Sequence, residues 1–179
     1  MFTFPKLRRE RPVKWLVVSA MLMAMNVIMS SFSIPVPGGH LYLNDAVICT
    51  AAILLDPLGA FLVGGVGAFL GDFFFYPAPM FVSLVTHGLQ AVVICCISHY
   101  GNGEKRLGRT CVALVLGAAI NVVGYSIGRS FVYATPEAAL LKLPFQIFQA
   151  CFGAAVAGVL CFPAGILKVW KKFAGEKAA

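Results

Sequence analysis

Six apolar segments, separated by short connections, occupy most of this 179-residue chain. A membrane-spanning helix needs about 20 mainly apolar residues, and fewer where it is partly buried in protein. Only 12% of the residues are charged, against roughly 25% in soluble domains. The sequence therefore predicts an all-α membrane protein, with residues 1–179 forming a single bundle of six transmembrane helices. The predicted helices are Val13–Ser31, Tyr42–Leu55, Pro57–Phe75, Met80–Ser98, Thr110–Tyr133 and Ala138–Val169.

Prolines and glycines mark the connections. Residues 32–40, between the first two segments, carry Pro-Val-Pro-Gly-Gly, which excludes a continuous helix there. Residues 76–79, Tyr-Pro-Ala-Pro, form a second stiff loop. The last segment is long, and we expect Pro144 and Pro163 to bend it or to mark its ends. We interpret the first segment as a retained helix, because no Ala-x-Ala cleavage pattern follows it.

The cations predict the orientation of the chain. Basic residues precede the first segment, fill the connection after the fourth and follow the sixth: Lys6, Arg8, Arg9, Arg11, Lys14, Lys105, Arg106, Arg109, Lys168, Lys171, Lys172 and Lys177. An even number of crossings places all three groups on one side, which the positive-inside rule makes cytoplasmic. Both termini are therefore predicted to be cytoplasmic. The net charge of +7 follows from this topology and gives no reason to expect nucleic-acid binding.

The last three segments each carry polar side chains at helical spacing. The three rows are Ser83, His87 and Gln90; Asn121, Tyr125 and Arg129; and Lys142, Gln146 and Gln149. Spacing of three or four residues puts each row on one helix face, in the outer half of the predicted membrane. Lipid cannot hydrogen-bond these groups, so we expect them to face one another or a ligand. They predict a small-molecule pocket that is open to the outside and closed to the cytoplasm.

These residues also have interpretations other than a ligand pocket. Hydrogen bonds between helices that merely fix their packing explain any single Ser, Asn or Gln equally well. Arg129 and Lys142 lie near the outer ends of their segments, where a long side chain can reach the membrane surface. His87 lies deeper and suits contact with a ring heteroatom near neutral pH, or a structural role.

Three carboxylates lie within or beside the apolar segments. We expect Asp45 to cap the second segment and Asp56 to cap the third, since an acidic side chain stabilises the positive end of a helix. Asp72 lies toward the outer end of the third segment. We expect it to pair with Arg129 or Lys142, or to contact the ligand.

Catalytic and metal-binding motifs are absent from the sequence. It contains no His-Glu-x-x-His, no Gly-x-Ser-x-Gly and no Walker loop, so we expect neither an enzyme nor ATP hydrolysis by this chain. The six cysteines have no metal-ligand spacing, and no cofactor is expected. Small residues recur at Ala20-x-x-x-Ala24 and in residues 64–71, a pattern that permits close helix packing.

Four motifs in the first half of the chain occur in a recognisable order. They are Gly-Gly-His-Leu-Tyr-Leu-Asn-Asp-Ala at 38–46, Ala-Ala-Ile-Leu-Leu-Asp-Pro-Leu-Gly-Ala at 51–60, the glycine-rich stretch ending in Asp72, and Tyr-Pro-Ala-Pro at 76–79. The series resembles the substrate-binding S components of energy-coupling factor (ECF) vitamin transporters. His87 precedes Gly88 where relatives often have lysine, which weakens any transfer of an anionic ligand from those relatives.

The resemblance implies a function and partners. It implies a multi-pass protein of the bacterial cell membrane that binds a vitamin from outside and topples when docked to a transmembrane T subunit, driven by two cytoplasmic ATPase subunits. Ala20 and Ala24 match the element that contacts the T subunit, and the loop 33–40 matches one that covers the vitamin. The expected substrate contacts are the nine residues of the three rows, together with His40 and Asn44.

The residues leave several alternatives for the identity of the cargo. Neutral hydrogen-bonding groups, the His87 imidazole and the aromatic Tyr125, Phe145 and Phe148 suit a small hydroxylated heteroaromatic ring, such as pyridoxine or hydroxymethylpyrimidine. Arg129 and Lys142 would instead suit a carboxylate such as pantothenate. A rival function of another class is a small intramembrane lipid-modifying enzyme that uses Asp72 and His87 as acid and base.

Overall fold

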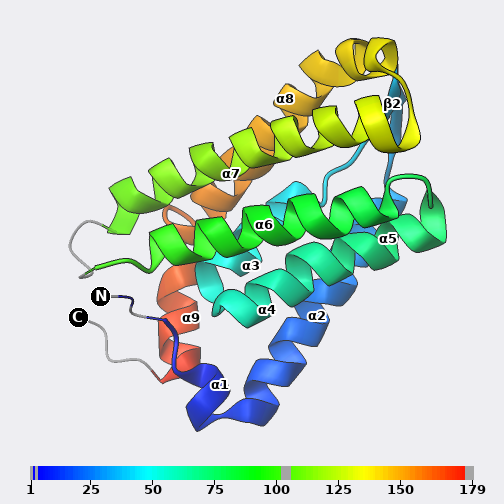
Figure 1. The fold of residues 1–179 in the computed structure, drawn as a ribbon. Helices are drawn as coiled ribbons and strands as arrows, with labels where there is room; N and C mark the ends of the chain where they lie inside the picture. The colour runs from blue at the N-terminus through cyan, green and yellow to red at the C-terminus, as the bar shows by residue number, and fades with distance from the viewer. Residues whose placement is uncertain (1, 3, 102–105, 176–179) are drawn as a thin grey trace.

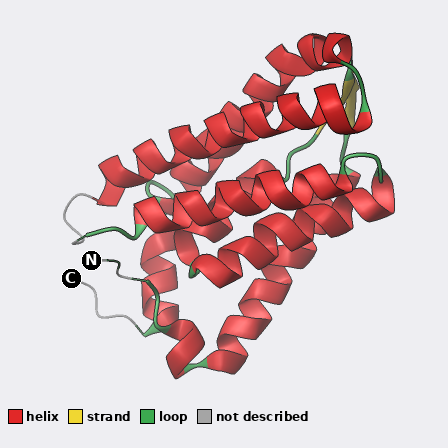
Figure 2. Ribbon diagram, in the orientation of Figure 1, coloured by secondary structure: helices red, strands yellow, loops and turns green. Residues whose placement is uncertain are grey.

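The computed structural model describes residues 2, 4–101 and 106–175 of the chain, so the predictions for Lys105 and Lys177 lie outside the described residues. The described chain is a helical bundle with one small hairpin, and the expected all-α membrane protein is confirmed (Figures 1 and 2). The helices are α1 (Leu7–Glu10), α2 (Pro12–Ser31), α3 (Asp45–Leu54), α4 (Pro57–Phe61), η1 (Leu62–Val66), α5 (Gly67–Phe75), α6 (Met80–Ser98), α7 (Arg106–Gly128), η3 (Arg129–Tyr133), α8 (Pro136–Cys161) and α9 (Ile166–Ala174).

Five helical segments among the described residues are long and apolar enough to cross a membrane. They are Pro12–Ser31, Pro57–Phe75, Met80–Ser98, Arg106–Tyr133 and Pro136–Cys161. The second of these runs through α4, η1 and α5, and η1 is a π-helical turn within it. The predicted bounds of the first, third and fourth segments agree with the structure to within one residue.

The short helix α3 lies at the centre of the bundle. It has ten residues and is buried on almost every side, where α6 and α8 pack against it. A helix that is apolar all round must be covered by protein or lipid, and here other helices cover it. The predicted segment Tyr42–Leu55 began too early, because residues 42–44 lead from the hairpin into the helix.

The predicted last segment, Ala138–Val169, was wrong as one helix. Helix α8 ends at Cys161, and a turn containing Pro163 and Gly165 leads into α9. Gly165 has φ +78°, a left-handed conformation that favours glycine. Pro144 lies inside α8 and does not end it. Helix α9 then packs Leu167 and Trp170 into the core together with Leu7 of α1.

The hairpin caps one end of the bundle, opposite the end that carries α1 and α9 (Figure 1). Strands β1 (Ile34–Val36) and β2 (Gly39–Leu41) are antiparallel, with Pro35 opposite His40. Gly38 at the turn has φ +78°. The sequence predicted only a non-helical loop here, because three-residue strands are too short for an alternating pattern to be visible.

Close contact between helices explains the glycine-rich stretch of residues 64–71. A Cβ added at Gly65 would lie 3.0 Å from the Cα of Gly88, so the backbones of η1 and α6 nearly touch. This contact supports the internal-packing interpretation of that pattern. The same contact holds α6, which carries the first polar row, close to η1.

Candidate substrate-binding site

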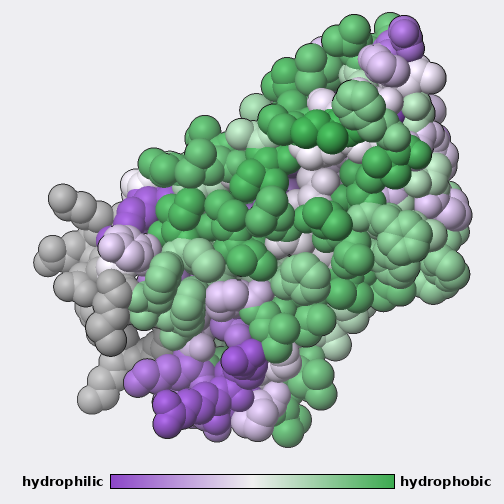
Figure 3. All heavy atoms as spheres, in the orientation of Figure 1, coloured by the Kyte–Doolittle hydropathy of each residue, from purple (hydrophilic) through white to green (hydrophobic). Residues whose placement is uncertain are grey.

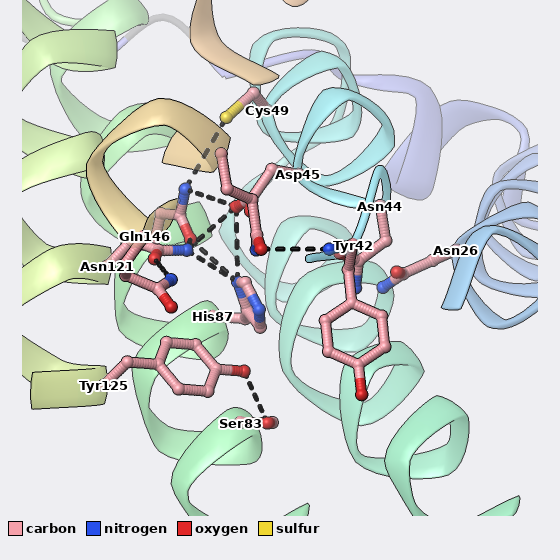
Figure 4. Close-up of polar contacts among 12 residues, drawn as sticks. Asn26, Tyr42, Asn44, Asp45, Cys49, Ser83, His87, Asn121, Tyr125 and Gln146 are labelled. Carbon is pink, nitrogen blue, oxygen red and sulfur yellow. Dashed lines mark hydrogen bonds and ion pairs between the residues drawn. The ribbon is translucent and has the colours of Figure 1, made fainter. Parts of the chain in front are cut away.

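Asp45 lies at the centre of a buried polar network that joins four helices (Figure 4). Its side chain is 1% exposed. One carboxylate oxygen accepts hydrogen bonds from Asn121 Nδ2 at 2.9 Å and Gln90 Nε2 at 3.2 Å. The other oxygen accepts from Gln149 Nε2 at 2.7 Å. The predicted capping role was wrong, because α3 has no side-chain capping bond and the carboxylate instead contacts all three polar rows.

The amide groups around Asp45 also bond to one another. His87 Nδ1 lies 2.8 Å from Gln90 Oε1 and 3.7 Å from Asp45 Oδ1. Asn121 donates to Gln90 Oε1 at 3.1 Å, and its own Oδ1 accepts from Gln146 Nε2 at 2.6 Å. The three rows therefore face each other, as their spacing indicated. A network in which each buried group has a partner holds its side chains in fixed positions.

A second polar group lies beside the network, on the side of the hairpin. Ser83 donates to Asp72, and its Oγ lies 2.5 Å from the Tyr125 hydroxyl. The Tyr125 ring meets the His87 ring edge-on at 5.3 Å. The expected ion pair of Asp72 with Arg129 or Lys142 was wrong: within the described residues, the partner of Asp72 is Ser83.

Both cations of the rows are buried. Lys142 is 1% exposed, and its Nζ donates to the main-chain carbonyl of His40 at 2.5 Å, which ties the hairpin to α8. Arg129 lies with its guanidinium 5.6 Å from the centre of the Tyr133 ring. Both side chains are therefore enclosed by the protein, and Arg129 also lines the cavity described next.

A cavity of about 20 Å³ lies beneath the hairpin, next to the network. This volume corresponds to roughly one water molecule. Its lining is polar and aromatic: His40, Tyr42, Asp72, Tyr76, Pro79, Tyr125, Arg129, Tyr133, Gln146 and Gln149. The main-chain N–H of Tyr42 donates to Gln149 Oε1 at 3.0 Å. Burial, followed by the nearby Asp72, raises the pKa of the Tyr42 phenol well above its usual range.

Not every predicted site residue reaches this cavity. Asn44 donates to Ser30 of α2 at 3.3 Å and does not line the cavity. Sequence reasoning missed Tyr42, Tyr76 and Tyr133, which lie in or beside loops. For Tyr42 and Tyr76 the available signal was their position at the proline-containing connections, whereas Tyr133 ends η3 and has no such signal.

Ala20 and Ala24 are exposed on α2. A different face of α2 buries Ser19, Asn26 and Ser30 against the bundle. The two alanines therefore do not serve internal packing, and their contact with a partner helix stays a prediction. Among the described residues, no group of three or more His, Cys, Asp or Glu could hold a metal ion.

The chain matches the profile of a family described as "ECF-type riboflavin transporter, S component" over residues 11–165. This match covers well over half of the chain. The chain belongs to the ECF transporter S-component family. A search of curated proteins found no match.

Membership in the S-component family makes the chain a substrate-binding component of a transporter and not an enzyme. The two residues that the enzyme alternative would use have separate hydrogen-bond partners in the structure. Asp72 accepts from Ser83, whereas His87 Nδ1 faces Gln90 and Asp45. The family resemblance that the ordered motifs indicated is thereby confirmed.

Proposed function

We propose that this S component is the high-affinity vitamin-binding subunit of an ATP-driven ECF uptake transporter in a bacterial cell membrane. It binds its vitamin from outside, between the hairpin and the Asp45 network, and passes it on in complex with a T subunit and two ATPase subunits. The observation that carries the proposal is the convergence of polar rows from α6, α7 and α8 on Asp45, directly beneath the hairpin.

The balance of charges supports a neutral cargo. Two carboxylates, Asp45 and Asp72, and two cations, Arg129 and Lys142, surround the cavity and the network, so their formal charges cancel. A carboxylate ligand such as pantothenate would bring an unmatched negative charge into a buried site, which is unfavourable. Pantothenate is therefore a less favoured cargo than a neutral vitamin.

The chemistry of the lining supports a hydroxylated heteroaromatic ring. Amides donate and accept in the plane of a ring, and Gln146 and Gln149 offer both functions next to the tyrosines of the cavity. Aromatic side chains contact the faces of such a ring. Pyridoxine and hydroxymethylpyrimidine combine a flat nitrogen heterocycle with hydroxymethyl groups, and we propose them as the leading cargo.

Riboflavin is the second candidate, because the family description names it. The pyrimidine edge of its ring system carries donors and acceptors that match asparagine and glutamine side chains. Its three fused rings and sugar-alcohol chain are larger than the leading candidates, so binding would require a wider opening of the hairpin around the cavity.

The test is ligand identification by native mass spectrometry on the purified chain in detergent, followed by calorimetric titration with pyridoxine, hydroxymethylpyrimidine, riboflavin and pantothenate. Tight binding of one vitamin would support the function and identify the cargo. If no vitamin binds and only lipid is retained, the proposal fails.

A pair of asparagine variants tests the location of the site. Asn121 and Asn26 are both fully buried, but Asn121 belongs to the network, whereas Asn26 donates to the carbonyl of Val63 at 2.6 Å and neither bonds to Asp45 nor lines the cavity. Each Ala variant loses a buried hydrogen bond and about 1–3 kcal/mol of stability. Only Asn121→Ala should also lose vitamin affinity. Equal affinity of the two variants would place the site elsewhere.

A further inference from the structure

An open cavity of about 490 Å³ lies at the end of the bundle opposite the hairpin. It is formed where α1 meets the start of α4, and its lining includes Phe4, three cations, Asp56 and Leu58. Hydrophilic side chains gather over α1 on the molecular surface, next to the apolar surface of the long helices (Figure 3). Neither the vitamin site nor the expected contact at Ala20 and Ala24 uses this cavity.

The cations of this cavity are Lys6, Arg8 and Arg9, and all three are exposed. They are held in place because Leu7, between them, is 2% exposed and packs into the core. A buried anchor of this kind directs its charged neighbours outward. The cations therefore belong to an ordered surface.

The carboxylate in the cavity already has partners. Asp56 accepts from Trp15 Nε1 at 2.6 Å and from the Gly59 N–H at 3.3 Å, and it pairs with Arg8 Nε at 3.4 Å. This finding confirms the predicted capping role of Asp56. Among the described residues, neither Lys6 nor Arg9 forms an ion pair with a carboxylate. The cavity thus presents two cationic groups whose charge Asp56 does not offset.

An apolar path leads from these cations along the outside of α4. Leu58 and Phe61 are exposed large apolar residues, and they are one turn apart on the same helix. A free inorganic anion would use the cations alone. A ligand with a phosphate and acyl chains would use both the cations and the apolar path.

We propose that this cavity binds an anionic phospholipid, with its phosphate between Lys6 and Arg9 and an acyl chain along Leu58 and Phe61. Basic groups at the membrane surface attract anionic lipids, each contributing a factor of about five in affinity. The cavity places two such groups around one pocket, so the lipid occupies a defined position next to the α1–α4 junction. This site is separate from the vitamin site, and its test does not depend on the cargo.

Trp15 reports on this cavity because it contacts Asp56 and lies under the Arg8 guanidinium at 6.0 Å. The chain has two tryptophans, and Trp170→Phe leaves Trp15 as the single emitter. The variant is placed in phosphatidylcholine vesicles with an increasing fraction of phosphatidylglycerol that carries brominated acyl chains. Bromine quenches tryptophan at short range. We expect quenching to saturate at a low fraction of phosphatidylglycerol, and not with brominated phosphatidylcholine.

Two double variants distinguish a defined lipid site from general attraction of anionic lipid to a basic surface. Lys6→Gln with Arg9→Gln removes both cavity cations and should weaken phosphatidylglycerol binding about 25-fold. Lys168→Gln with Lys172→Gln removes equal charge from exposed positions of α9, outside the cavity, and should change binding by less than about twofold.

Equal losses in the two double variants, or equal quenching by the two brominated lipids, would overturn the proposal. Competition by soluble glycerol phosphate at millimolar concentration would assign the site to a free phosphate and likewise overturn it. Native mass spectrometry of the wild-type chain gives an independent readout, because one tightly retained phosphatidylglycerol is expected, and the Lys6→Gln, Arg9→Gln variant should lose it.

Discussion

Gln149 Nε2 of α8 lies 2.7 Å from Asp45 Oδ2 at the start of α3, and this bond joins positions 104 residues apart. The same glutamine accepts the main-chain N–H of Tyr42 through its Oε1. One side chain therefore connects the buried carboxylate to the segment that leads out of the hairpin. Contact of a vitamin with this glutamine would affect both the network and the hairpin.

The first prediction concerns the charge of Asp45. Asp45→Asn keeps the shape of the side chain but replaces one acceptor oxygen with a donor, which then faces the Asn121, Gln90 or Gln149 amide. Hydrogen bonds to charged groups contribute about 1.5–3 kcal/mol, so we expect stability to fall by about that amount and vitamin affinity to fall at least tenfold. Thermal unfolding and titration in detergent measure the two effects.

Asp56→Asn is the control for that experiment, since Asp56 is also a buried, hydrogen-bonded carboxylate but lies at the other end of the bundle. It should lose stability and keep vitamin affinity. If Asp45→Asn binds the vitamin as tightly as the wild type, Asp45 has no role in the site.

The second prediction concerns the bond between Lys142 Nζ and the His40 carbonyl. The cavity of about 20 Å³ cannot hold a vitamin unless the hairpin moves outward, and this bond holds the hairpin in place. Lys142→Met retains the length of the side chain but cannot donate. We expect the vitamin to dissociate about 10–100-fold faster, corresponding to about 1.5–3 kcal/mol. Stopped-flow measurements give the rate, and Lys168→Met on exposed α9 should leave it unchanged.

The third prediction uses two glycines that share the same positive φ angle. Gly38 in the hairpin and Gly165 after α8 both have φ +78°, which costs a side-chain-bearing residue about 1–2 kcal/mol. A Cβ at Gly38 would also lie 2.8 Å from the Ala138 carbonyl oxygen, whereas a Cβ at Gly165 would meet no atom within 4 Å. Gly38→Ala should weaken vitamin binding about tenfold, and Gly165→Ala should only lower stability. Similar affinities of both variants would show that the hairpin does not cover the site.

The structural features that could be predicted from the sequence are those that produce a periodic pattern of residues. Apolar length identified the membrane helices, and polar spacing placed Gln90, Asn121 and Gln149 on facing sides of three helices. Asp45 was misinterpreted because a carboxylate at a helix start has a sufficient local explanation in capping. Its partners lie 45, 76 and 104 positions away, and no local pattern contains them. The ion pair expected for Asp72 failed for the same reason: the neighbour that bonds it is decided by tertiary packing.

The fourth prediction concerns the exposed alanines of α2. Ala24→Trp adds a bulky ring at a small residue that leaves room for a partner helix, so it should abolish co-purification with the T subunit. The proposed vitamin site lies elsewhere in the bundle, so vitamin affinity should stay unchanged. Val115→Trp is the control, because Val115 is an exposed apolar residue of α7. A complex retained by Ala24→Trp would assign the T-subunit contact to another surface.

The fifth prediction concerns His99, which follows α6 at the end opposite the hairpin. His99 is 3% exposed; its Nδ1 lies 2.9 Å from the Cys95 carbonyl oxygen and its Nε2 lies 3.3 Å from Arg106 Nη2. Burial, and then the Arg106 charge, lower the pKa of His99 from 6.5 to about 4. The folded state therefore holds this imidazole neutral, while the unfolded chain protonates it below its ordinary pKa.

The sign of the pH dependence follows from this difference. Between about pH 6.5 and 4 the unfolded chain binds more protons at this site, so the free energy of unfolding falls as the pH falls, by up to about 3 kcal/mol from His99. His99→Gln cannot be protonated and should show a smaller loss of stability between pH 7 and 4. Arg106→Gln removes the repelling charge and should also reduce the loss. Thermal unfolding of the three proteins across this range measures the effect, and identical slopes for all three would refute the assignment to His99.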